Sequence, residues 1–454
     1  MGVLTVFVAL SLLGATRSEY TFVRRVSLAP RSLEPAVLPA AEFAVPFTAK
    51  TPRRKSKKTA LAALRGKSRA LGGSSTVAVD GSDFDDEYLT NATIGGQHFS
   101  LIVDTGSSDT WVAQRGFNCF DLDENPVPEA TCAFGTPGFN TAASKTFQPF
   151  PNVSFNITYG DGEFLSGPVG FDTVTIGGLS VARQEIGVPT LTAWEGDGIN
   201  TGLIGLAFPD LTSVYNTTDP TKASAENQIP YNPLFLSAVS QKKVAHPFFS
   251  VALDRGTFDQ QENDPFDPNL GFLAFGGIAP VPVVNTAVTV PIEGYSATGT
   301  PSNGPGSDFF FYTVEVEAYT FPGASVRPVG SPILDTGTTL NFMSTEVTTA
   351  YNAKFDPPAV LDEDAGLWVV ECNATVPEFG VKIGGKTFTI DARDQILPAG
   401  TDDNGNIICI SGTQDGGPDV ADNIFILGDV FLHNVVATFN PVAAEITLTQ
   451  RAKY

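Results

Sequence analysis

The stretch "FSLIVDTGSSDTWVAQ", residues 99–114, places a carboxylate at the end of an apolar run. The run "LIV" is typical of a buried strand, and Asp104 follows it directly, in a turn of small and hydroxylated residues. A second stretch, "SPILDTGTTLNFM" at residues 331–343, repeats this arrangement around Asp335. Two acids in the same local setting suggest that they share one task.

A second pair of motifs accompanies the two acids and indicates an internal duplication. "TGLIGLAF", residues 201–208, and "FILGDVFL", residues 425–432, each follow one of the acids by roughly a hundred residues. Because order and spacing repeat, we expect two similar lobes related by an approximate two-fold axis. If the acid-bearing loops lie on that axis, Asp104 and Asp335 meet in a single site.

The composition favours a mostly β chain of two lobes. The 454 residues include 44 Gly and 33 Pro, and turn residues break the apolar runs throughout. "TIGG" at 93–96 and 175–178 and "KIGG" at 382–385 predict hairpin turns. Helices are expected to be few and short, for example over residues 232–243.

Charge is divided unevenly along the chain. Residues 16–76 contain 13 of the 27 Lys and Arg but 3 of the 49 Asp and Glu, which leaves 14 bases, 46 acids and a formal charge of −32 for residues 77–454. A basic head on an acidic body suggests a removable segment that pairs electrostatically with the acidic remainder of the chain. A nucleic-acid-binding tail is the competing interpretation. We expect no nucleic-acid partner, because the basic run sits behind an apolar leader.

The leader, residues 1–17, contains an apolar run too short to span a bilayer. It resembles a secretory signal peptide, although no Lys or Arg precedes the run; a membrane anchor or buried helix is the alternative. We expect an exported protein without membrane attachment. Residence in an acidic vacuole is the alternative location.

Four cysteines in an exported chain predict two disulfide bonds. Three pairings are possible, and the local choice is Cys119–Cys132 with Cys372–Cys409. Free buried thiols are the alternative. Candidate glycosylation sites, each a weak signal alone, are Asn91, Asn152, Asn156, Asn216 and Asn373.

Two carboxylates a few ångströms apart cannot both ionise cheaply, so they share one proton. The ionised member can take a proton from a water molecule that attacks an amide carbonyl, while the protonated member bonds the carbonyl oxygen. This chemistry needs no metal or cofactor, and we expect neither. The three histidines lie far apart in sequence, and no acid-rich run has the spacing of a calcium loop.

Residues next to the two acids are suited to support them. Gly106 and Gly337 permit a close approach of the two loops. The hydroxyls of Thr105 and Thr336 can bond across to the partner loop. The hydroxyls of Ser107 and Thr338 can bond the outer carboxylate oxygens and tune the acidity of the two carboxyls.

These motifs resemble those of pepsin-like aspartic endopeptidases, peptidase family A1, most closely in style the secreted fungal members. The resemblance covers nearly all of residues 76–454, and its motifs occur in family order: "VDTGSSDTWV", "ITYGDGEFLSG", "GLIGLAF", "LAFGGIAP", "LDTGTTLNF" and "ILGDVFL". It implies an all-β, bilobal pepsin-like fold with an active-site cleft between pseudo-two-fold-related lobes. It also implies that Asp104 and Asp335 are the catalytic pair, and this family is the standard example of two carboxylates sharing a proton.

The resemblance implies a flap over the cleft that carries Tyr159, Gly160 and Asp161, with Trp111 supporting the tyrosine. It further implies cleavage at large apolar residues. A carboxylate at Asp161 could attract a Lys or Arg beside the scissile bond; otherwise Asp161 is a solvated turn residue. Substrates would be proteins and peptides.

The resulting domain prediction has four parts. Residues 1–17 form a signal peptide, 18–75 a basic inhibitory propeptide, 76–280 an N-terminal β lobe with the flap, and 281–454 a C-terminal β lobe. The mature protein is expected to be an acid-acting monomer, with its own propeptide as inhibitor.

Two rival functions use the same residues differently. A glycosidase also employs two carboxylates, but at the wider separations that a proton-sharing pair excludes. A non-catalytic binding protein of the same fold would be expected to lack a catalytic acid or a neighbour of it. Both DTG triplets and the flap tyrosine are present here.

Overall fold

The computed structural model describes a large part of the chain. The described residues are 38–50, 88–135, 137–159, 162–196, 198–255, 266–267, 270–295, 301–302, 309–363, 365–401, 405–419 and 425–454. The signal peptide (1–17), most of the expected propeptide, and the flap residues Gly160 and Asp161 lie outside them.

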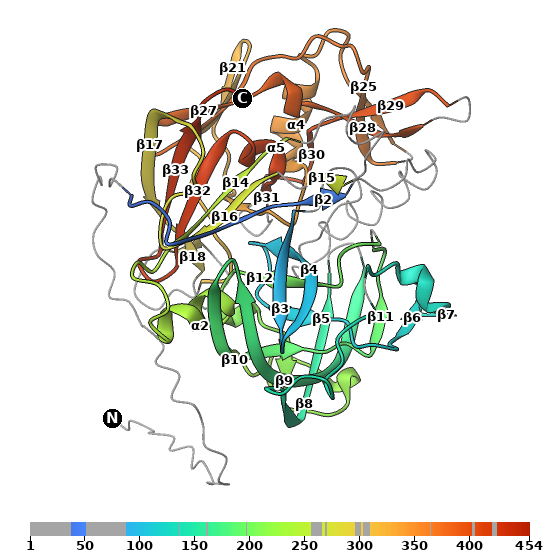
Figure 1. The fold of residues 1–454 in the computed structure, drawn as a ribbon. Coiled ribbons are helices and arrows are strands. Elements are labelled where there is room, and N and C mark those ends of the chain that lie inside the picture. The colour runs from blue at the N-terminus through green and yellow to red at the C-terminus, as the bar shows by residue number, and fades with distance from the viewer. Residues whose placement is uncertain are drawn as a thin grey trace, which may run out of the picture.

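The N-terminal lobe is built on one large, strongly twisted sheet (Figure 1). Its strands are β3 (Leu89–Ile94), β4 (Gln97–Asp104), β5 (Thr110–Val112), β6 (Asn118–Phe120), β7 (Pro126–Val127), β8 (Gln148–Thr158), β9 (Phe164–Ile176), β10 (Leu179–Gly187), β11 (Leu191–Ala193), β12 (Gly202–Gly205) and β13 (Val214–Tyr215). Strand β4 ends at Asp104 and pairs in parallel with β12, so that Asp104 lies opposite Gly205.

The C-terminal lobe contains three four-stranded sheets. Their strands are β20 (Ala318–Phe321), β21 (Ala324–Val326), β22 (Pro332–Leu334), β23 (Asn341–Met343), β24 (Val360–Asp362), β25 (Leu367–Val370), β26 (Phe379–Ile383), β27 (Lys386–Ile390), β28 (Ile396–Thr401), β29 (Ile407–Ser411), β30 (Thr413–Asp415) and β31 (Phe425–Leu427). Strand β22 ends just before Asp335 and pairs in parallel with β31. This is the relation that β4 has to β12, and it confirms the duplication predicted from the sequence.

A six-stranded sheet joins the two halves of the chain in the order β1-β16-β14-β32-β33-β17. Its strands are β1 (Phe43–Pro46), β14 (Phe249–Leu253), β16 (Gly271–Phe275), β17 (Val283–Pro291), β32 (Val435–Asn440) and β33 (Glu445–Arg451). The outermost strand, β1, comes from the basic head and runs antiparallel to β16. Part of the expected propeptide is thus integrated into the fold.

Within the described residues the helices are few and short, as expected: α2 (Leu234–Ser240), α4 (Thr345–Asn352), α5 (Asp429–Leu432) and the 3-10 turns η1 (Glu129–Cys132), η2 (Pro209–Leu211), η3 (Pro220–Lys222) and η4 (Ala392–Asp394). Two short ribbons pair β2 (Ala49–Lys50) with β15 (Phe266–Asp267) and β18 (Gly294–Tyr295) with β19 (Pro301–Ser302). None of the helices in the described ranges has the length and apolarity to cross a membrane. The predicted hairpin turns are confirmed, and their six glycines all have positive φ: Gly95, Gly96, Gly177, Gly178, Gly384 and Gly385.

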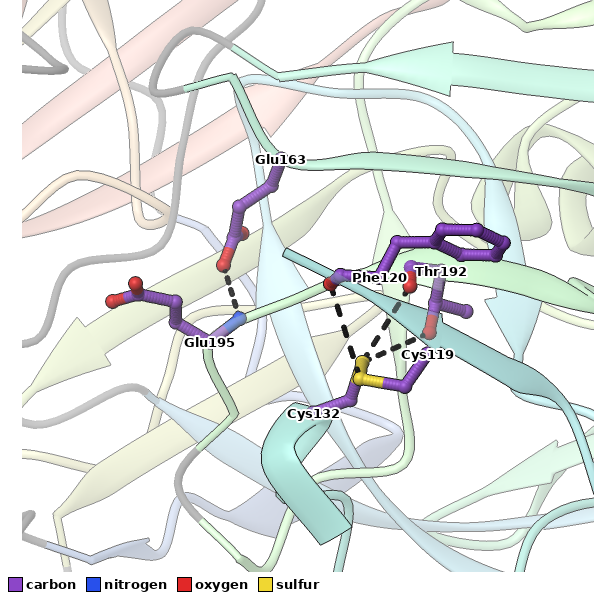
Figure 2. The surroundings of a disulfide bond; sticks show 6 residues. All are labelled: Cys119, Phe120, Cys132, Glu163, Thr192 and Glu195. Atoms are coloured by element: carbon purple, nitrogen blue, oxygen red, sulfur yellow. Dashed lines mark hydrogen bonds between the residues drawn. A yellow bond between two sulfur atoms is a disulfide. The ribbon is translucent and has the colours of Figure 1, made fainter. Parts of the chain in front are cut away.

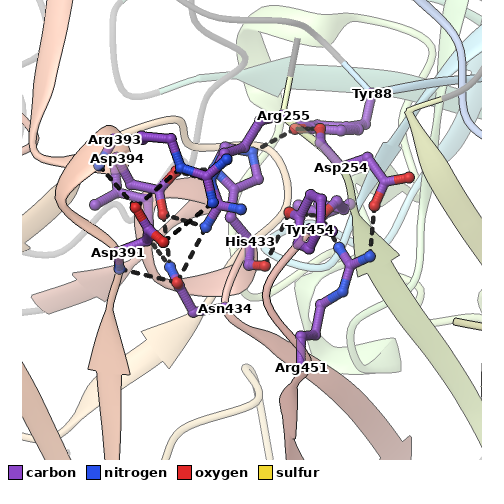
Figure 3. Close-up of polar contacts among 12 residues, drawn as sticks. Tyr88, Asp254, Arg255, Asp391, Arg393, Asp394, His433, Asn434, Arg451 and Tyr454 are labelled. Carbon is purple, nitrogen blue, oxygen red and sulfur yellow. Dashed lines mark hydrogen bonds and ion pairs between the residues drawn. The ribbon is translucent and has the colours of Figure 1, made fainter. Parts of the chain in front are cut away.

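A buried polar network holds the two halves together (Figure 3). The carboxylate of Asp394 accepts two hydrogen bonds from Arg255, at 2.6 and 2.7 Å, and lies 3.1 Å from His433 Nδ1. His433 Nε2 in turn lies 2.6 Å from the hydroxyl of Tyr88, which donates to the carbonyl of Asp254. Because Tyr88 immediately precedes β3 and His433 follows α5, the network ties the start of one lobe to the end of the other.

Candidate active site

The two acid-bearing loops are linked by reciprocal hydrogen bonds between their threonines. The amide of Thr105 donates to Thr336 Oγ1 at 3.1 Å, and the amide of Thr336 donates to Thr105 Oγ1 at 3.0 Å. Each hydroxyl then donates across the interface, Thr105 to Leu334 O at 2.9 Å and Thr336 to Val103 O at 2.7 Å. The four bonds form a two-fold-symmetric link between the lobes.

This link places the two carboxylates against each other. A Cβ atom added at Gly106 would lie 2.5 Å from Asp335 Oδ1, and one added at Gly337 would lie 2.6 Å from Asp104 Oδ1. Each glycine is therefore required by the acid of the opposite lobe, since any larger residue would occupy the space of that carboxylate. Asp104 and Asp335 are 1% and 0% exposed.

Each carboxylate receives a matched set of donors from its own loop. Asp104 accepts from the amide of Gly106 at 2.6 Å and from the hydroxyl of Ser107. Asp335 accepts from the amide of Gly337 at 2.9 Å and from Thr338 Oγ1 at 2.6 Å. These donors stabilise the ionised form, and because one reaches Oδ1 and the other Oδ2 of the same carboxylate, they fix the orientation of each side chain.

The surroundings raise the pKa values of both acids, for partly different reasons. Burial raises the pKa of Asp104, and the hydrogen bonds from Ser107, Asp335 and Gly106 partly offset that rise. Burial also raises the pKa of Asp335, and the adjacent charge of Asp104 raises it well above its usual range. The pair is therefore expected to hold one proton between its two carboxyls.

The two motifs that follow the acids, residues 201–208 and 425–432, are the apolar–Gly elements. They pack against the acid-bearing loops. Ala207 donates its amide to Ser107 O at 2.8 Å, and Asp429 donates its amide to Thr338 O at 2.9 Å. A Cβ at Gly205 would lie 2.5 Å from the backbone of Ser108, and one at Gly428 would lie 2.2 Å from Thr338 O. The repeated glycines thus allow the two backbones to pack closely, as the sequence pattern predicts.

The β8–β9 hairpin is the segment expected to form the flap, and Tyr159 directly follows the last residue of β8. Trp111 Nε1 donates to the Tyr159 hydroxyl at 2.8 Å, and both side chains are buried. Burial raises the pKa of Tyr159 well above its usual range, and the charge of Asp104 adds to the shift. Trp111 and Tyr159 thus occupy the relation that the sequence motifs imply.

Both disulfides that the structure contains are local. Cys119 is bonded to Cys132, and Cys372 to Cys409, and the described part of the chain has no free cysteine. The first bond joins β6 to η1 and packs against Thr192 of β11 (Figure 2). It therefore staples the side of the N-terminal lobe next to the flap.

Two buried acids near the site were not singled out from the sequence. Asp109 is fully buried and accepts from the amide of Ser213 at 3.0 Å and from the hydroxyl of Tyr231 at 2.7 Å. Glu163, directly after the flap motif "YGDG", is 4% exposed. The only available signal was an acid inside a motif otherwise made of small or apolar residues.

Metal coordination finds no support in the described residues, where no three His, Cys, Asp or Glu side chains gather closely enough to hold an ion.

Comparisons with known proteins agree with this geometry. Residues 87–451 match the family model described as eukaryotic aspartyl protease. A probable aspartic-type endopeptidase of Aspergillus fumigatus is 39% identical over 371 residues, which is 80% of this chain and 79% of the relative. Penicillopepsin-1 of Penicillium janthinellum is 28% identical over 81% of this chain and 96% of its own.

A solved structure shares the fold. The aspartic proteinase of Irpex lacteus has a TM-score of 0.60 at 21% sequence identity, covering 90% of this chain and 97% of the other. With the match of the family model, these findings define the class: an aspartic-type endopeptidase, a hydrolase of peptide bonds. The chain belongs to the eukaryotic aspartyl protease family.

Proposed function

We propose that Asp104 and Asp335 are the catalytic pair of an acid-acting endopeptidase. The observation that carries this assignment is the reciprocal threonine link, which brings two buried carboxylates into one proton-sharing unit. Such a pair works only while one member is ionised and the other protonated, so activity belongs at acidic pH.

Hydrolysis follows from the two protonation states. Asp104 takes a proton from a water molecule whose oxygen attacks the peptide carbonyl carbon, while Asp335 gives its proton to the carbonyl oxygen. The tetrahedral diol then collapses: Asp104 gives its proton to the amine nitrogen as the C–N bond breaks, Asp335 takes a proton from one hydroxyl of the diol, and the pair returns to its singly protonated state. The donors Ser107 and Thr338 hold both carboxylates in place throughout.

The substrate preference follows from the family resemblance. We propose cleavage at large apolar residues, with Lys accepted beside the scissile bond through Asp161. This residue lies outside the described residues, so the support comes from the "YGDG" motif alone. Comparing peptides that carry Lys or Leu next to the cleaved bond, in the native enzyme and in Asp161→Ser, would test the preference.

We also propose that the protein is made as a zymogen whose basic head is removed. Support comes from β1, which lies in the range 18–75 and pairs with β16. Phe47, next to it, is fully buried against Tyr88, with ring centroids 5.5 Å apart. Cleavage is expected near residues 70–80, beyond the basic run. Acid incubation followed by N-terminal sequencing would locate the new end.

The proposed route is secretory, with an acidic vacuole as the alternative destination. Two disulfides suit an oxidising compartment. Of the candidate glycosylation sites, Asn91, Asn152, Asn216 and Asn373 are exposed. Asn156 instead donates its side-chain amide to Pro220 O at 3.1 Å, so the four exposed residues are the better candidates. Mass spectrometry of the exported protein before and after glycosidase treatment would test both proposals.

The central test is cleavage of an unfolded protein by the acid-treated zymogen across about pH 2–7, since the paired acids predict a bell-shaped profile. Wild type is compared with Asp104→Asn and Asp335→Asn, with and without pepstatin, the inhibitor that the family resemblance nominates. Acid-optimal cleavage that pepstatin blocks and either variant abolishes supports the assignment. Undiminished cleavage by the folded Asp104→Asn protein would refute it. Absence of cleavage by folded, propeptide-free wild type would instead favour a non-catalytic binding protein.

A further inference from the structure

Glu163 lies at the turn end of the β8–β9 hairpin, just outside its paired residues. The β8–β9 ladder ends with Thr158 opposite Phe164, and the β9–β11 ladder ends with Ala193 opposite the same Phe164. Glu163 is the next residue outward. Its carbonyl still accepts from the amide of Tyr159 at 2.7 Å, so Glu163 lies directly across the hairpin from the flap tyrosine.

Beyond the last residue pair between β9 and β11, the side chain of Glu163 makes the next hydrogen bond between the two segments. Its Oε1 accepts from the amide of Glu195 at 2.6 Å (Figure 2). A buried carboxylate is costly unless it is hydrogen-bonded, and a bond from an amide to a carboxylate is stronger than one between neutral groups. The carboxylate thus extends the β9–β11 contact beyond the last ladder pair.

The segment that Glu163 binds is itself firmly held. The ring of Trp194 packs edge-on against Trp111 at 5.2 Å and against Tyr159 at 5.8 Å, centroid to centroid. The amide of Gly196 donates to the carbonyl of Cys132 at 3.2 Å, and Cys132 is in the disulfide with Cys119. The hydrogen bond to Glu195 therefore connects the turn end of the β8–β9 hairpin to a segment that is held next to the Cys119–Cys132 disulfide.

Tyr159 is consequently fixed from two directions. One runs through the backbone, from Tyr159 to Glu163 and on to Glu195. The other runs through the rings, because Trp194, next to Glu195, contacts Tyr159 and Trp111. Glu163 belongs to both, since its side chain sets the position of the Trp194–Glu195 backbone relative to the flap.

We propose that Glu163 is a positioning residue for peptide hydrolysis, whose carboxylate latches the turn end of the β8–β9 hairpin to Trp194–Glu195 and so fixes Tyr159 in its contacts with Trp111 and Trp194. The inference rests on the proposed roles of Asp104 and Asp335. Glu163 itself contacts neither the reacting atoms nor the pair; it acts through Tyr159.

Loss of the hydrogen bond between Glu163 and Glu195 is expected to change KM more than kcat. Because the acid and base are untouched, loss of the latch weakens closure over the substrate and leaves the chemical step largely intact. KM should rise, pepstatin should bind more weakly by a similar factor, and kcat should change little. The pH optimum, which the carboxylate pair sets, should stay where it is.

Three variants of Glu163 test this. Glu163→Ala removes the acceptor, Glu163→Asp keeps the charge but withdraws it by one methylene, and Glu163→Gln keeps an acceptor oxygen at the same reach. We expect KM to rise about tenfold for Ala and Asp and to stay within about twofold for Gln, the range for losing or keeping one such bond. Glu378→Ala, at an exposed position in the C-terminal lobe, is the matched control.

The measurements are KM, kcat and pepstatin affinity at several pH values on activated enzyme, with thermal unfolding as a check of folding. A raised KM in Ala and Asp that Gln restores supports the latch. Wild-type KM in either Ala or Asp, or an equal loss of kcat in all three variants, overturns it. If Glu163→Ala does not fold, Glu163→Asp and Glu163→Gln decide the question. The proposed function fails separately, through activity retained by Asp104→Asn.

Discussion

Thr105 and Thr336 complete each other's loops: each threonine's amide donates to the other's hydroxyl, at 3.1 and 3.0 Å. Neither loop reaches this arrangement with bonds from its own lobe. The geometry of the carboxylate pair is therefore a property of the assembled interface, and weakening the interface should weaken catalysis and stability together.

Thr336→Val tests that coupling. The change keeps the shape of the side chain but leaves the buried amide of Thr105 and the carbonyl of Val103 without their partner. An unsatisfied buried group costs about 1–3 kcal/mol, and we expect a loss of that order in the free energy of unfolding, with a reduced kcat. Thr90→Val is the matched control, because Thr90 is fully buried and its hydroxyl has no hydrogen-bond partner among the described residues. Equal effects of the two changes in urea unfolding would contradict the prediction.

Ser107→Ala should move the acidic limb of the pH–rate profile. The Ser107 hydroxyl donates to Asp104 and lowers the pKa of that carboxyl against the rise caused by burial. Without it, the pKa rises further and Asp104 becomes protonated at higher pH. We expect the acidic limb of kcat/KM to shift upward by about one pH unit, the equivalent of one hydrogen bond to a charge. An unshifted limb with reduced kcat would assign Ser107 a purely geometric role.

Glu185 should limit stability at neutral pH. Burial raises its pKa from 4.5 to about 8, and the charge of Asp109 contributes. Because the folded state favours the protonated form, the contribution of Glu185 to stability is greatest below about pH 4.5 and falls as the pH rises towards about 8, by on the order of 5 kcal/mol. Glu185→Gln should flatten this decline. Urea unfolding at several pH values checks it, and parallel curves for wild type and variant would argue against the assignment.

Ionisation of Asp109 also lowers the stability of the folded state as the pH rises, but over a lower pH range than ionisation of Glu185. Burial raises its pKa from 3.8 to about 6 despite the donors Ser213 and Tyr231. Its ionisation therefore removes stability between about pH 4 and 6. Asp109→Asn should remove this part of the decline, while the Glu185 part, which burial chiefly causes, remains but is reduced by the loss of the Asp109 charge. Differential scanning calorimetry across the two pH ranges would separate the two parts. A decline that Asp109→Asn leaves unchanged would exclude this group.

Ionised Asp394 should stabilise the fold, and its protonation should reduce the stability at low pH. Burial alone would raise its pKa, but His433 and Arg255 outweigh burial and lower it. A lowered pKa stabilises the fold above the usual value near 3.8, and this stability is lost as the pH falls through the folded-state pKa. Asp394→Asn should be less stable at pH 5 yet lose little more on acidification. A steeper acid loss in the variant than in wild type would refute this.

The sequence allowed prediction of the parts of the site that repeat. Asp104 and Asp335, their neighbouring glycines and threonines, and the apolar–Gly elements lie in local motifs that occur twice. Duplication makes such residues recognisable, because chance rarely repeats an ordered pair of motifs. The structure brings all of them together.

The residues that escaped prediction depend on partners distant in sequence. Asp109 reads locally as a polar turn residue, yet its donors Ser213 and Tyr231 follow 104 and 122 residues later. Glu163 likewise acquires its role only when Glu195 lies beside it. A side chain whose environment comes from a remote segment carries no local signal of its burial, so propensity and pattern cannot reveal it.

Strand β1 has a consequence for the moment of activation. It covers the outer edge of β16, where Ala44 and Val45 lie opposite Ala274 and Leu273. Removing the basic head would uncover a row of unpaired backbone groups on an apolar strand, the kind of edge on which chains aggregate. If the head is removed as proposed, another strand has to take the place of β1 to keep this edge of the sheet paired.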